Sequence, residues 1–414
     1  MLTTATFEDF LPVVTKAHKK RGAILKIANK YPTPFYLFDQ DELKKSITDF
    51  VATFEKVIPN LKAYYAIKSN SHPLVLKTVL KCGLGLDISS GRELEIALDH
   101  GTKNILFSGP GKTDEKLRLA VKNNTSVTIN IDNFSELKRL GSISKKEKKT
   151  INAGVRIFTK HHGLWNKFGI PLNDLKDFWL EAEKYPYIKL KGIQFHTSHN
   201  EDAQKYELII KDIADYLKKN FTQEMRDEIK FVDFGGGFMP DGLEGCYEEK
   251  DLEKKEIKIL ALKSMPIKSF AKTISGALKK HLNPLLNCTY YCEPGRIFST
   301  KAMHLVLRIT DVKNEYSNIT DGGTNMVGVG WGFGEKYFFP IVNLTHPSKS
   351  VLKTAVYGSL CTPRDVWGYH CYASKMTAND ILVIPNQGAY TYSMAQSFIK
   401  EIPAVYALPS GKSF

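Results

Sequence analysis

The stretch Tyr65-Ala66-Ile67-Lys68-Ser69-Asn70 places a lysine where an apolar run, Leu61 to Ile67, gives way to a polar turn. An amine at the lip of a buried strand is partly desolvated, which favours the neutral, nucleophilic form that makes Schiff bases with carbonyl compounds. Lysines also end strands as ordinary solubilising residues. The residues at the other strand ends decide between these two interpretations of Lys68.

Glycines and an arginine follow two later apolar runs. In Phe234-Gly235-Gly236-Gly237-Phe238, three glycines let the backbone approach a ligand with successive amide hydrogens, as a phosphate requires, although a tight turn needs the same residues. Cys292-Glu293-Pro294-Gly295-Arg296 sets a glycine beside a fixed cation, which suits phosphate or carboxylate. Together they favour a phosphorylated cofactor. A nicotinamide fold is disfavoured, because no GxGxxG motif opens a helix early in the chain.

Eight short apolar, β-branched runs lie between residues 60 and 300, and each is followed by a helical pattern or by a loop leading to one. Ser90 and Asn133 each precede a glutamate at the third following position, which marks the start of a helix. Eight strand-helix units in about 250 residues predict a (β/α)8 TIM barrel. The runs are Leu61 to Ile67, Leu84 to Ile88, Asn104 to Phe107, Val127 to Ile131, Ile151 to Ile157, Ile188 to Phe195, Lys230 to Phe234 and Cys288 to Cys292.

Functional groups of such barrels gather at the C-terminal ends of the strands. In this sequence, unusual residues fall at six of the predicted ends, and one shared pocket explains them better than chance does. They are Lys68, Asp87, Arg156, His196, the run Gly235 to Gly237, and Glu293.

After residue 300 the pattern changes to strands and turns rich in glycine and aromatic residues, which predicts an appended β domain. We expect residues 1–38 to contribute to this β domain, residues 39–300 to form the barrel and residues 301–414 to form the C-terminal domain. Asp241 to Lys268 is charged and begins without apolar periodicity, so it looks like an insertion into the barrel. It could be a lid, but a surface loop is the favoured interpretation.

The 414 residues include 58 Lys and Arg against 44 Asp and Glu, a formal net charge of +14. The lysines are spread along helical faces, which favours a solvated surface over a specific anionic partner, although an anionic small substrate is compatible with the charge. No motif predicts nucleic-acid binding. No apolar window reaches the length of a membrane span and no signal-peptide layout opens the chain, so we expect a cytoplasmic protein. The cysteines form no CxxC pair, so neither a disulfide framework nor a metal site is predicted.

Six motifs, in order along nearly the whole chain, resemble those of the fold-type III pyridoxal-phosphate-dependent decarboxylases, the relatives of diaminopimelate and ornithine decarboxylases. The resemblance implies an alanine-racemase-like barrel with a C-terminal β domain, and pyridoxal 5'-phosphate as cofactor. The motifs are Tyr65 to Lys68, Asn166 to Ile170, the triple glycine, Glu293 to Arg296, Cys361 followed by Asp365, and Gly388-Ala389-Tyr390.

By this resemblance, Lys68 holds the cofactor as an internal aldimine and His196 stacks on its ring. A carboxylate at Glu293 beside the pyridine nitrogen favours the protonated ring, which stabilises the carbanion left when carbon dioxide departs. Alanine racemases have an arginine at that place, so Glu293 favours a decarboxylase over a racemase. The phosphate would be bound by Gly235, Gly236, Gly237, Gly295, Arg296 and Tyr390, and Asp87, Arg156 and Ser198 complete the expected cofactor contacts.

Cys361 carries a thiol that can protonate the carbon after decarboxylation. In relatives this segment reaches into the barrel of a second copy, so the resemblance predicts a homodimer whose monomer is inactive. An isolated cysteine is otherwise an ordinary small core residue. A catalytically silent regulatory homologue is the rival from another class, and the joint presence of Lys68, Glu293 and Cys361 argues against it.

Two departures from the family pattern bear on the substrate and the phosphate. Diaminopimelate decarboxylases usually carry Glu-Ser-Gly-Asp after the cysteine, and this chain has Thr362-Pro363-Arg364-Asp365, which loses an ammonium partner. Arg364 offers a cation to a carboxylate instead, although it could equally point to solvent. This run, and Ser108 to Thr113, resemble the siderophore-biosynthesis branch, which decarboxylates citrate-conjugated amino acids. Second, His199 stands where relatives have a serine, and Ser198 is expected to replace it.

We therefore predict a decarboxylase of a carboxylate-bearing or conjugated amino acid. Diaminopimelate decarboxylase of lysine biosynthesis, or a decarboxylase of another basic amino acid, is the alternative. The predicted substrate-binding residues are Arg296, Arg364, Asp365 and Tyr390.

Overall fold

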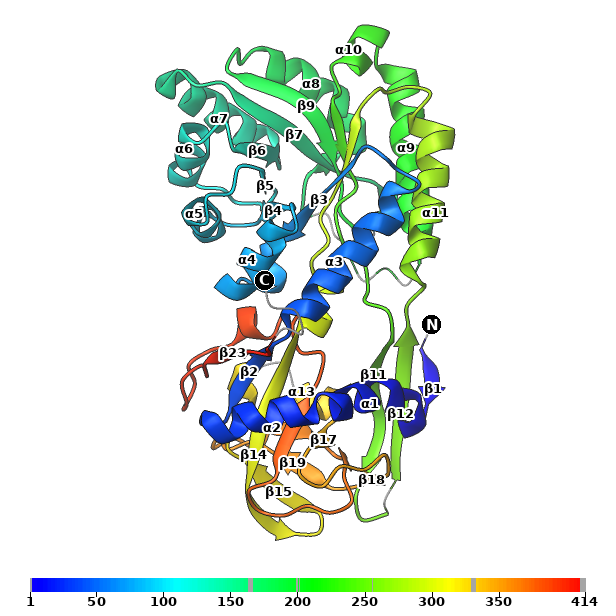
Figure 1. The fold of residues 1–414 in the computed structure, drawn as a ribbon. Coiled ribbons are helices and arrows are strands. Elements are labelled where there is room, and N and C mark those ends of the chain that lie inside the picture. Colours follow the sequence, from blue (N-terminus) through cyan, green and yellow to red (C-terminus); the bar gives the residue numbers. More distant parts are fainter. Residues whose placement is uncertain are drawn as a thin grey trace. The chain divides into compact units, whose positions relative to one another are not determined.

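The computed structural model describes residues 2–162, 167–198, 200, 202–254, 256–328 and 333–409. The chain divides into two compact units, which we call the barrel unit and the β unit (Figure 1). The barrel unit comprises Ser46–Met239 and Met265–Gly295, and the β unit comprises Met1–Lys45, Pro240–Ser264 and Arg296–Phe414. The β unit is therefore assembled from three separate stretches of the chain.

A closed parallel sheet forms the centre of the barrel unit. Its strands follow the order β6-β5-β4-β3-β13-β10-β9-β7, and β6 also pairs with β7, which closes the ring. Every one of the eight predicted strands is confirmed, with each end within one residue of its expected position. The strands are β3 (Leu61–Ala66), β4 (Gly85–Ile88), β5 (Ile105–Phe107), β6 (Val127–Ile131), β7 (Ile151–Phe158), β9 (Ile188–Gln194), β10 (Phe231–Asp233) and β13 (Thr289–Cys292).

Amphipathic helices alternate with these strands. Both predicted helix starts are confirmed: the Ser90 hydroxyl accepts a hydrogen bond from the Glu93 amide at 3.2 Å, and the Asn133 side chain accepts one from the Glu136 amide at 2.9 Å. No helix in the described part of the chain is long and apolar enough to cross a membrane. The main helices along this stretch of chain are α3 (Gln40–Glu55), α4 (Pro73–Lys81), α5 (Gly91–Asp99), α6 (Asp114–Lys122), α7 (Phe134–Glu147), α8 (Leu175–Glu183), α9 (Gln204–Asn220), α10 (Gln223–Asp227) and α11 (Ile267–Ala277).

The β unit holds a larger mixed sheet, so the predicted fold class is confirmed. Strand β14 (Met303–Asn314) is its longest strand and pairs with β2 (Phe35–Phe38), β15 (Ser317–Thr320) and β22 (Ile381–Ile384). An N-terminal strand, β2, thus belongs to the same sheet as strands from the C-terminal third. The remaining strands of this sheet are β17 (Val342–Asn343), β18 (Val351–Leu352), β19 (Ala355–Tyr357), β20 (Val366–Gly368), β21 (Cys371–Tyr372) and β23 (Val405–Ala407).

The segment Asp241 to Lys268 corrects one prediction. It contains the antiparallel strands β11 (Leu243–Asp251) and β12 (Glu256–Lys263), which pair with β16 (Tyr337–Phe338) and β1 (Thr3–Ala5) in a four-stranded sheet. The surface-loop interpretation is therefore wrong. In β12, Ile259 and Ala261 are buried, while Glu256, Lys258 and Lys263 are exposed. That dense charge hides the alternation in the sequence.

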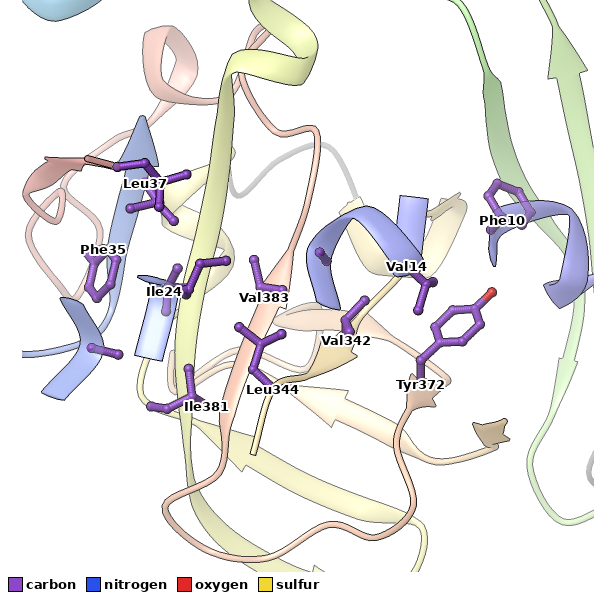
Figure 2. Close-up of a cluster of buried hydrophobic side chains, with 14 of the residues drawn as sticks. Phe10, Val14, Ile24, Phe35, Leu37, Val342, Leu344, Tyr372, Ile381 and Val383 are labelled. Carbon is purple, nitrogen blue, oxygen red and sulfur yellow. The ribbon is translucent and has the colours of Figure 1, made fainter. Parts of the chain in front are cut away.

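Apolar side chains from the ends and the middle of the chain share one core in the β unit (Figure 2). Phe10, Val14 and Ile24 come from the N-terminal helices, and α1 (Leu11–Lys19) and α2 (Arg21–Lys30) carry the latter two. They pack with Val342 and Val383 of the large sheet, both nearly inaccessible to solvent. Burial of apolar surface at roughly 25 cal/mol per Å² makes such a cluster the main attraction that holds the three stretches of this unit together.

Candidate active site

Lys68 and Asp87 lie together at the end of neighbouring strands. Strand β3 ends at Ala66, whose register partner on β4 is Asp87, and Lys68 follows in a single turn of 3-10 helix, Ile67–Ser69. Its Nζ lies 3.7 Å from Oδ2 of Asp87. Burial raises the pKa of Asp87, the charge of Glu293 raises it further, and the charge of Lys68 acts against both.

Glu293, directly after β13, is a buried carboxylate surrounded by donors. Its side chain is 2% exposed. The Ser108 hydroxyl and the Gln194 amide donate to its Oε1 at 3.3 Å and 3.1 Å. Burial acts to raise the pKa of Glu293, but the charges of Lys68 and Arg156, together with the two donors at Oε1, act against burial and lower it. Glu293 is therefore ionised in the barrel unit.

His196 follows β9, and its two ring nitrogens have different environments. Nδ1 accepts a hydrogen bond from the Gly236 amide at 3.1 Å and lies 3.4 Å from Oε2 of Glu293. A nitrogen that accepts an amide hydrogen carries no proton, so these hydrogen bonds assign the ring proton to Nε2. Burial lowers the pKa of His196, which agrees with a neutral ring.

The glycine turn after β10 needs glycine for two reasons. Gly235 and Gly237 have φ angles of +67° and +93°, and a Cβ atom on Gly235 would lie 2.5 Å from the carbonyl oxygen of Phe195. The Gly235 amide donates to Oδ1 of Asp233 at 2.9 Å. Two of the three predicted phosphate-binding amides, those of Gly235 and Gly236, thus have partners within the chain.

The other predicted barrel residues take less central positions. Arg156 donates to the Ser108 carbonyl at 3.4 Å, and its guanidinium lies 4.4 Å from the centre of the Phe168 ring. Ser198 is half-buried. A Cβ atom on Gly295 would lie 3.0 Å from the Cβ of Ala66, so glycine is required for close packing there. Asn166 and His199, which the sequence analysis singled out, lie outside the described residues.

Arg296 and Tyr390 belong to the β unit and lie near each other. The Arg296 guanidinium lies 6.0 Å from the centre of the Tyr390 ring, and Tyr390 has a φ angle of +60°, an uncommon conformation for a residue other than glycine. Such backbone strain is concentrated at functional sites. Arg296 also forms an ion pair with Oε2 of Glu244 at 3.0 Å, from the β11 strand.

The loop that carries Cys361 is closed by Asp365. Its Oδ1 accepts the Thr324 amide and its Oδ2 accepts the Leu360 amide, both at 2.6 Å, and the residue is 3% exposed. With both oxygens engaged by the backbone, Asp365 shapes the loop, and this geometry does not support its predicted contact with the substrate. Cys361 and Arg364, by contrast, are exposed.

Several polar neighbours of these residues were missed by sequence reasoning. Gln194 is the last residue of β9, and nothing in the sequence marks it as a partner of Glu293. Glu93 appears in the sequence only as a helix-start residue, yet its side chain accepts a hydrogen bond from the Ser89 amide at 2.5 Å. Burial raises the pKa of Glu93, and the charge of Lys68 acts to lower it. Glu244 could not be found because its segment was interpreted as a loop. In the described part of the chain, no group of three or more His, Cys, Asp or Glu residues could hold a metal ion.

Comparison with known proteins gives a consistent result. Residues 44–300 match the family model described as "Pyridoxal-dependent decarboxylase, pyridoxal binding domain". Diaminopimelate decarboxylase of Methanothermobacter thermautotrophicus is 25% identical, over 94% of this chain and 89% of the relative. A Staphylococcus aureus protein named 2-[(L-alanin-3-ylcarbamoyl)methyl]-2-hydroxybutanedioate decarboxylase is also 25% identical, over 89% and 92%. Diaminopimelate decarboxylase of Helicobacter pylori, solved with L-lysine, shares the fold with a TM-score of 0.76 and 23% identity, over 93% and 94%.

Proposed function

This chain belongs to the pyridoxal-dependent decarboxylase family and is an amino-acid carboxy-lyase that uses pyridoxal phosphate, and we propose that its substrate is a carboxylate-rich conjugate, or bears a further carboxylate without the distal ammonium group of diaminopimelate. The reacting groups of the proposal are Lys68, Glu293, His196 and Cys361. The observation that carries the decarboxylation chemistry is the buried, ionised Glu293, which is held by donors at the same strand ends as Lys68.

The residues of the barrel unit fit this cofactor. Lys68 offers an amine beside a buried carboxylate, and Glu293 offers a negative charge to a protonated ring nitrogen. The glycine turn has the positive φ angles found in anion-binding turns, although its Gly235 and Gly236 amides have partners within the chain. When bound, pyridoxal phosphate supplies the electron sink for the electrons that remain after the carboxyl group departs. The remaining contacts would come from Asp87, Arg156, Ser198, Gly295, Arg296 and Tyr390.

In this proposal each chemical task belongs to one side chain. Glu293 holds a proton on the ring nitrogen, because an ionised carboxylate in a buried site stabilises a neighbouring positive charge. The neutral ring of His196 presents a flat face for stacking. Lys68 would hold the cofactor through its Nζ, the nucleophilic amine at this end of the barrel.

Cys361 would donate the proton that replaces the carboxyl group. Its thiol is exposed on the loop that Asp365 closes, so it is accessible to a group outside its own unit. We propose that it acts in the barrel of a second copy of the chain, as the family resemblance implies. The functional molecule is then a homodimer with shared active sites.

The substrate proposal rests on residues of the same loop. Thr362 stands where diaminopimelate decarboxylases usually have an acid, and the exposed Arg364 offers a cation to a carboxylate. The name of the Staphylococcus aureus relative describes a substrate with several carboxylates. The alternative is diaminopimelate or another basic amino acid, which several relatives support by name.

Carbon dioxide release by the cofactor-loaded protein tests this proposal. The panel is meso-diaminopimelate, lysine, ornithine, arginine and a citryl-diamino-acid conjugate. Turnover of the conjugate alone supports the carboxylate-bearing substrate. Turnover of diaminopimelate contradicts our interpretation of the missing acid, and no turnover of any compound, with the cofactor bound, favours a silent homologue.

A further inference from the structure

A buried ion pair lies beside the candidate site without a role in the chemistry proposed above. Lys112 of the Ser108 to Thr113 segment and Glu136 of α7 meet at 2.8 Å, and both side chains are completely inaccessible to solvent. Replacing such a pair by apolar residues of similar volume is often neutral or stabilising, so stability alone does not explain it. The contacts of the pair show what it holds in place.

Lys112 fastens its segment to strand β6. Its Nζ donates to the main-chain carbonyl of Asn130 at 2.9 Å and to Oε1 of Glu136 at 2.8 Å. It also lies 5.2 Å from the centre of the Phe107 ring. Two of the three ammonium hydrogens therefore have acceptors, and the aromatic ring adds a cation–π contact.

The same asparagine leads from Lys112 to Glu293. The side-chain amide of Asn130 donates to the Ser108 hydroxyl at 3.1 Å, and that hydroxyl donates to Oε1 of Glu293 at 3.3 Å. Gly154 faces this asparagine, because a Cβ atom at Gly154 would lie 2.5 Å from Oδ1 of Asn130. Lys112 and Ser108 are the two ends of a five-residue stretch, and both contact Asn130. Lys112 contacts its main-chain carbonyl, and Ser108 contacts its side-chain amide.

We propose that Lys112 is a positioning residue: by fastening the 108–113 segment to Asn130, it keeps the Ser108 hydroxyl directed at Glu293 and so keeps Glu293 ionised. The inference rests on the proposed role of Glu293. Without the Lys112 side chain, the segment loses its tie to Asn130 and keeps the hydrogen bonds of the Ser108 amide to Ile88 and of Arg139 to the main-chain carbonyl of residue 112. Oε1 of Glu293 keeps Gln194 as its donor.

The expected change in the pKa of Glu293 follows from the protonation state that the Ser108 hydroxyl stabilises. A donor stabilises the charged carboxylate, so its loss raises the pKa of Glu293. Gln194 and the neighbouring charges remain and limit the change. The titratable or charged groups that face Glu293 from the surrounding elements are Lys68, Asp87, Arg156, His196, Tyr206, Asp233 and Cys292. Asp132 and Arg156 act on Lys112 in addition to Glu136.

The test uses the loaded protein and reads the cofactor directly. We would titrate the absorption spectrum of bound pyridoxal phosphate against pH in the wild type, in Ser108→Ala and in the double variant Lys112→Met/Glu136→Leu, which leaves no unpaired buried charge. The acid midpoint of the spectral change is expected to rise by roughly half to one pH unit, a shift of about three- to tenfold in the proton equilibrium. The acid limb of kcat/KM against pH should rise in parallel.

Matched variants separate positioning from folding. Lys116 and Glu95 form an exposed pair at 2.8 Å on the neighbouring helices, and Lys116→Met/Glu95→Leu should leave the midpoint unchanged. If Lys112→Met/Glu136→Leu does not fold, Lys112→Gln/Glu136→Gln keeps polar contacts and should give a smaller rise. A shift in Ser108→Ala with none in the folded Lys112 variants overturns the inference, and so does an unshifted Ser108→Ala. A wild-type protein that binds the cofactor but releases no carbon dioxide contradicts the proposed function instead.

Discussion

At the scale of single residues, the candidate site depends on one buried carboxylate, Glu293, that remains ionised. Glu293 stays ionised because uncharged donors, Ser108 and Gln194, contact Oε1 and because Lys68 and Arg156 contribute positive charge. Asp87 is also buried and lies close to Lys68, but its pKa is raised, whereas that of Glu293 is lowered. Two carboxyl groups with opposite shifts are typical of sites that divide acid and base tasks.

Cys361 gives the sharpest prediction at this scale. If its thiol donates the proton after decarboxylation, Cys361→Ala should lower kcat by roughly a hundredfold or more, the usual contribution of a positioned general acid. Binding of the cofactor should be unchanged. Carbon dioxide release and the absorption spectrum of the bound cofactor measure the two effects. Cys246→Ala, at a half-buried cysteine of β11, is the control, and equal losses in both variants would contradict the role of Cys361.

Residues such as Lys68 and Glu293 could be predicted because each ends a recognisable apolar run. Gln194 and Glu244 could not, because a polar residue within a strand has no local signal of the partner it meets. Asp365 shows a different limit. Its place in a motif was predicted, but the amides of Thr324 and Leu360, far apart in sequence, take its oxygens, and only the folded chain brings these three residues together.

At the scale of elements, Asp39 shows how one residue fixes the start of a helix in the β unit. It precedes α3, and its Oδ1 accepts the Glu42 amide at 3.1 Å, while Lys20 pairs with its Oδ2. Burial acts to raise the pKa of Asp39, but His304, Lys20 and the Glu42 amide outweigh burial and lower it. Its carboxylate therefore stabilises the folded state.

The pH dependence of this contribution follows from the sign of the shift. Because the pKa of Asp39 is lower in the folded state, its stabilisation is complete above the unfolded value of about 3.9 and is lost as pH falls below it. Asp39→Asn should reduce the free energy of unfolding by about 1–2 kcal/mol at neutral pH. Urea unfolding at pH 7 and near pH 3 should show this difference shrinking in acid. A difference that is constant or grows in acid would contradict the assignment.

The hairpin of β11 and β12 bears on the substrate through Glu244. Its ion pair with Arg296 at 3.0 Å means that a substrate carboxylate must compete for that arginine. Glu244→Gln should therefore lower KM for a carboxylate-rich substrate by about two- to tenfold, the range expected when a partly exposed ion pair is lost. Glu249→Gln changes an exposed glutamate of the same hairpin and should leave KM unchanged. A higher KM in Glu244→Gln would mean that Glu244 binds a cationic part of the substrate.

The barrel strands and the hairpin differ in how far the sequence predicts them. A barrel strand such as β5 is buried along its whole length, so its sequence is a continuous apolar run that ends at a polar turn. Strands β11 and β12 have one solvated face, and their lysines and glutamates obscure the short alternation of apolar residues. The hairpin also pairs with β1 from the start of the chain, and a partner so distant in sequence leaves no local trace.

At the scale of the whole molecule, the proposal divides each active site between two chains. Lys68 and Glu293 belong to the barrel unit, and Cys361 belongs to the β unit on an exposed loop. If each site combines the barrel of one copy with the Cys361 loop of the other, a chain without Lys68 and a chain without Cys361 can complement each other. No arrangement with complete sites in single chains allows this.

Mixing Lys68→Ala with Cys361→Ala tests this division. Random exchange of equal amounts of two chains makes half of the dimers mixed, and each mixed dimer has one intact site and one site that lacks both groups. Activity should therefore recover from near zero to about a quarter of the wild-type value, with sedimentation or light scattering confirming the dimer. Cys361→Ala mixed with Cys361→Ser, which has no intact pairing, should stay inactive. Failure to recover in a mixture proven to exchange subunits would place Lys68 and Cys361 in the same chain's site and remove the shared-site proposal.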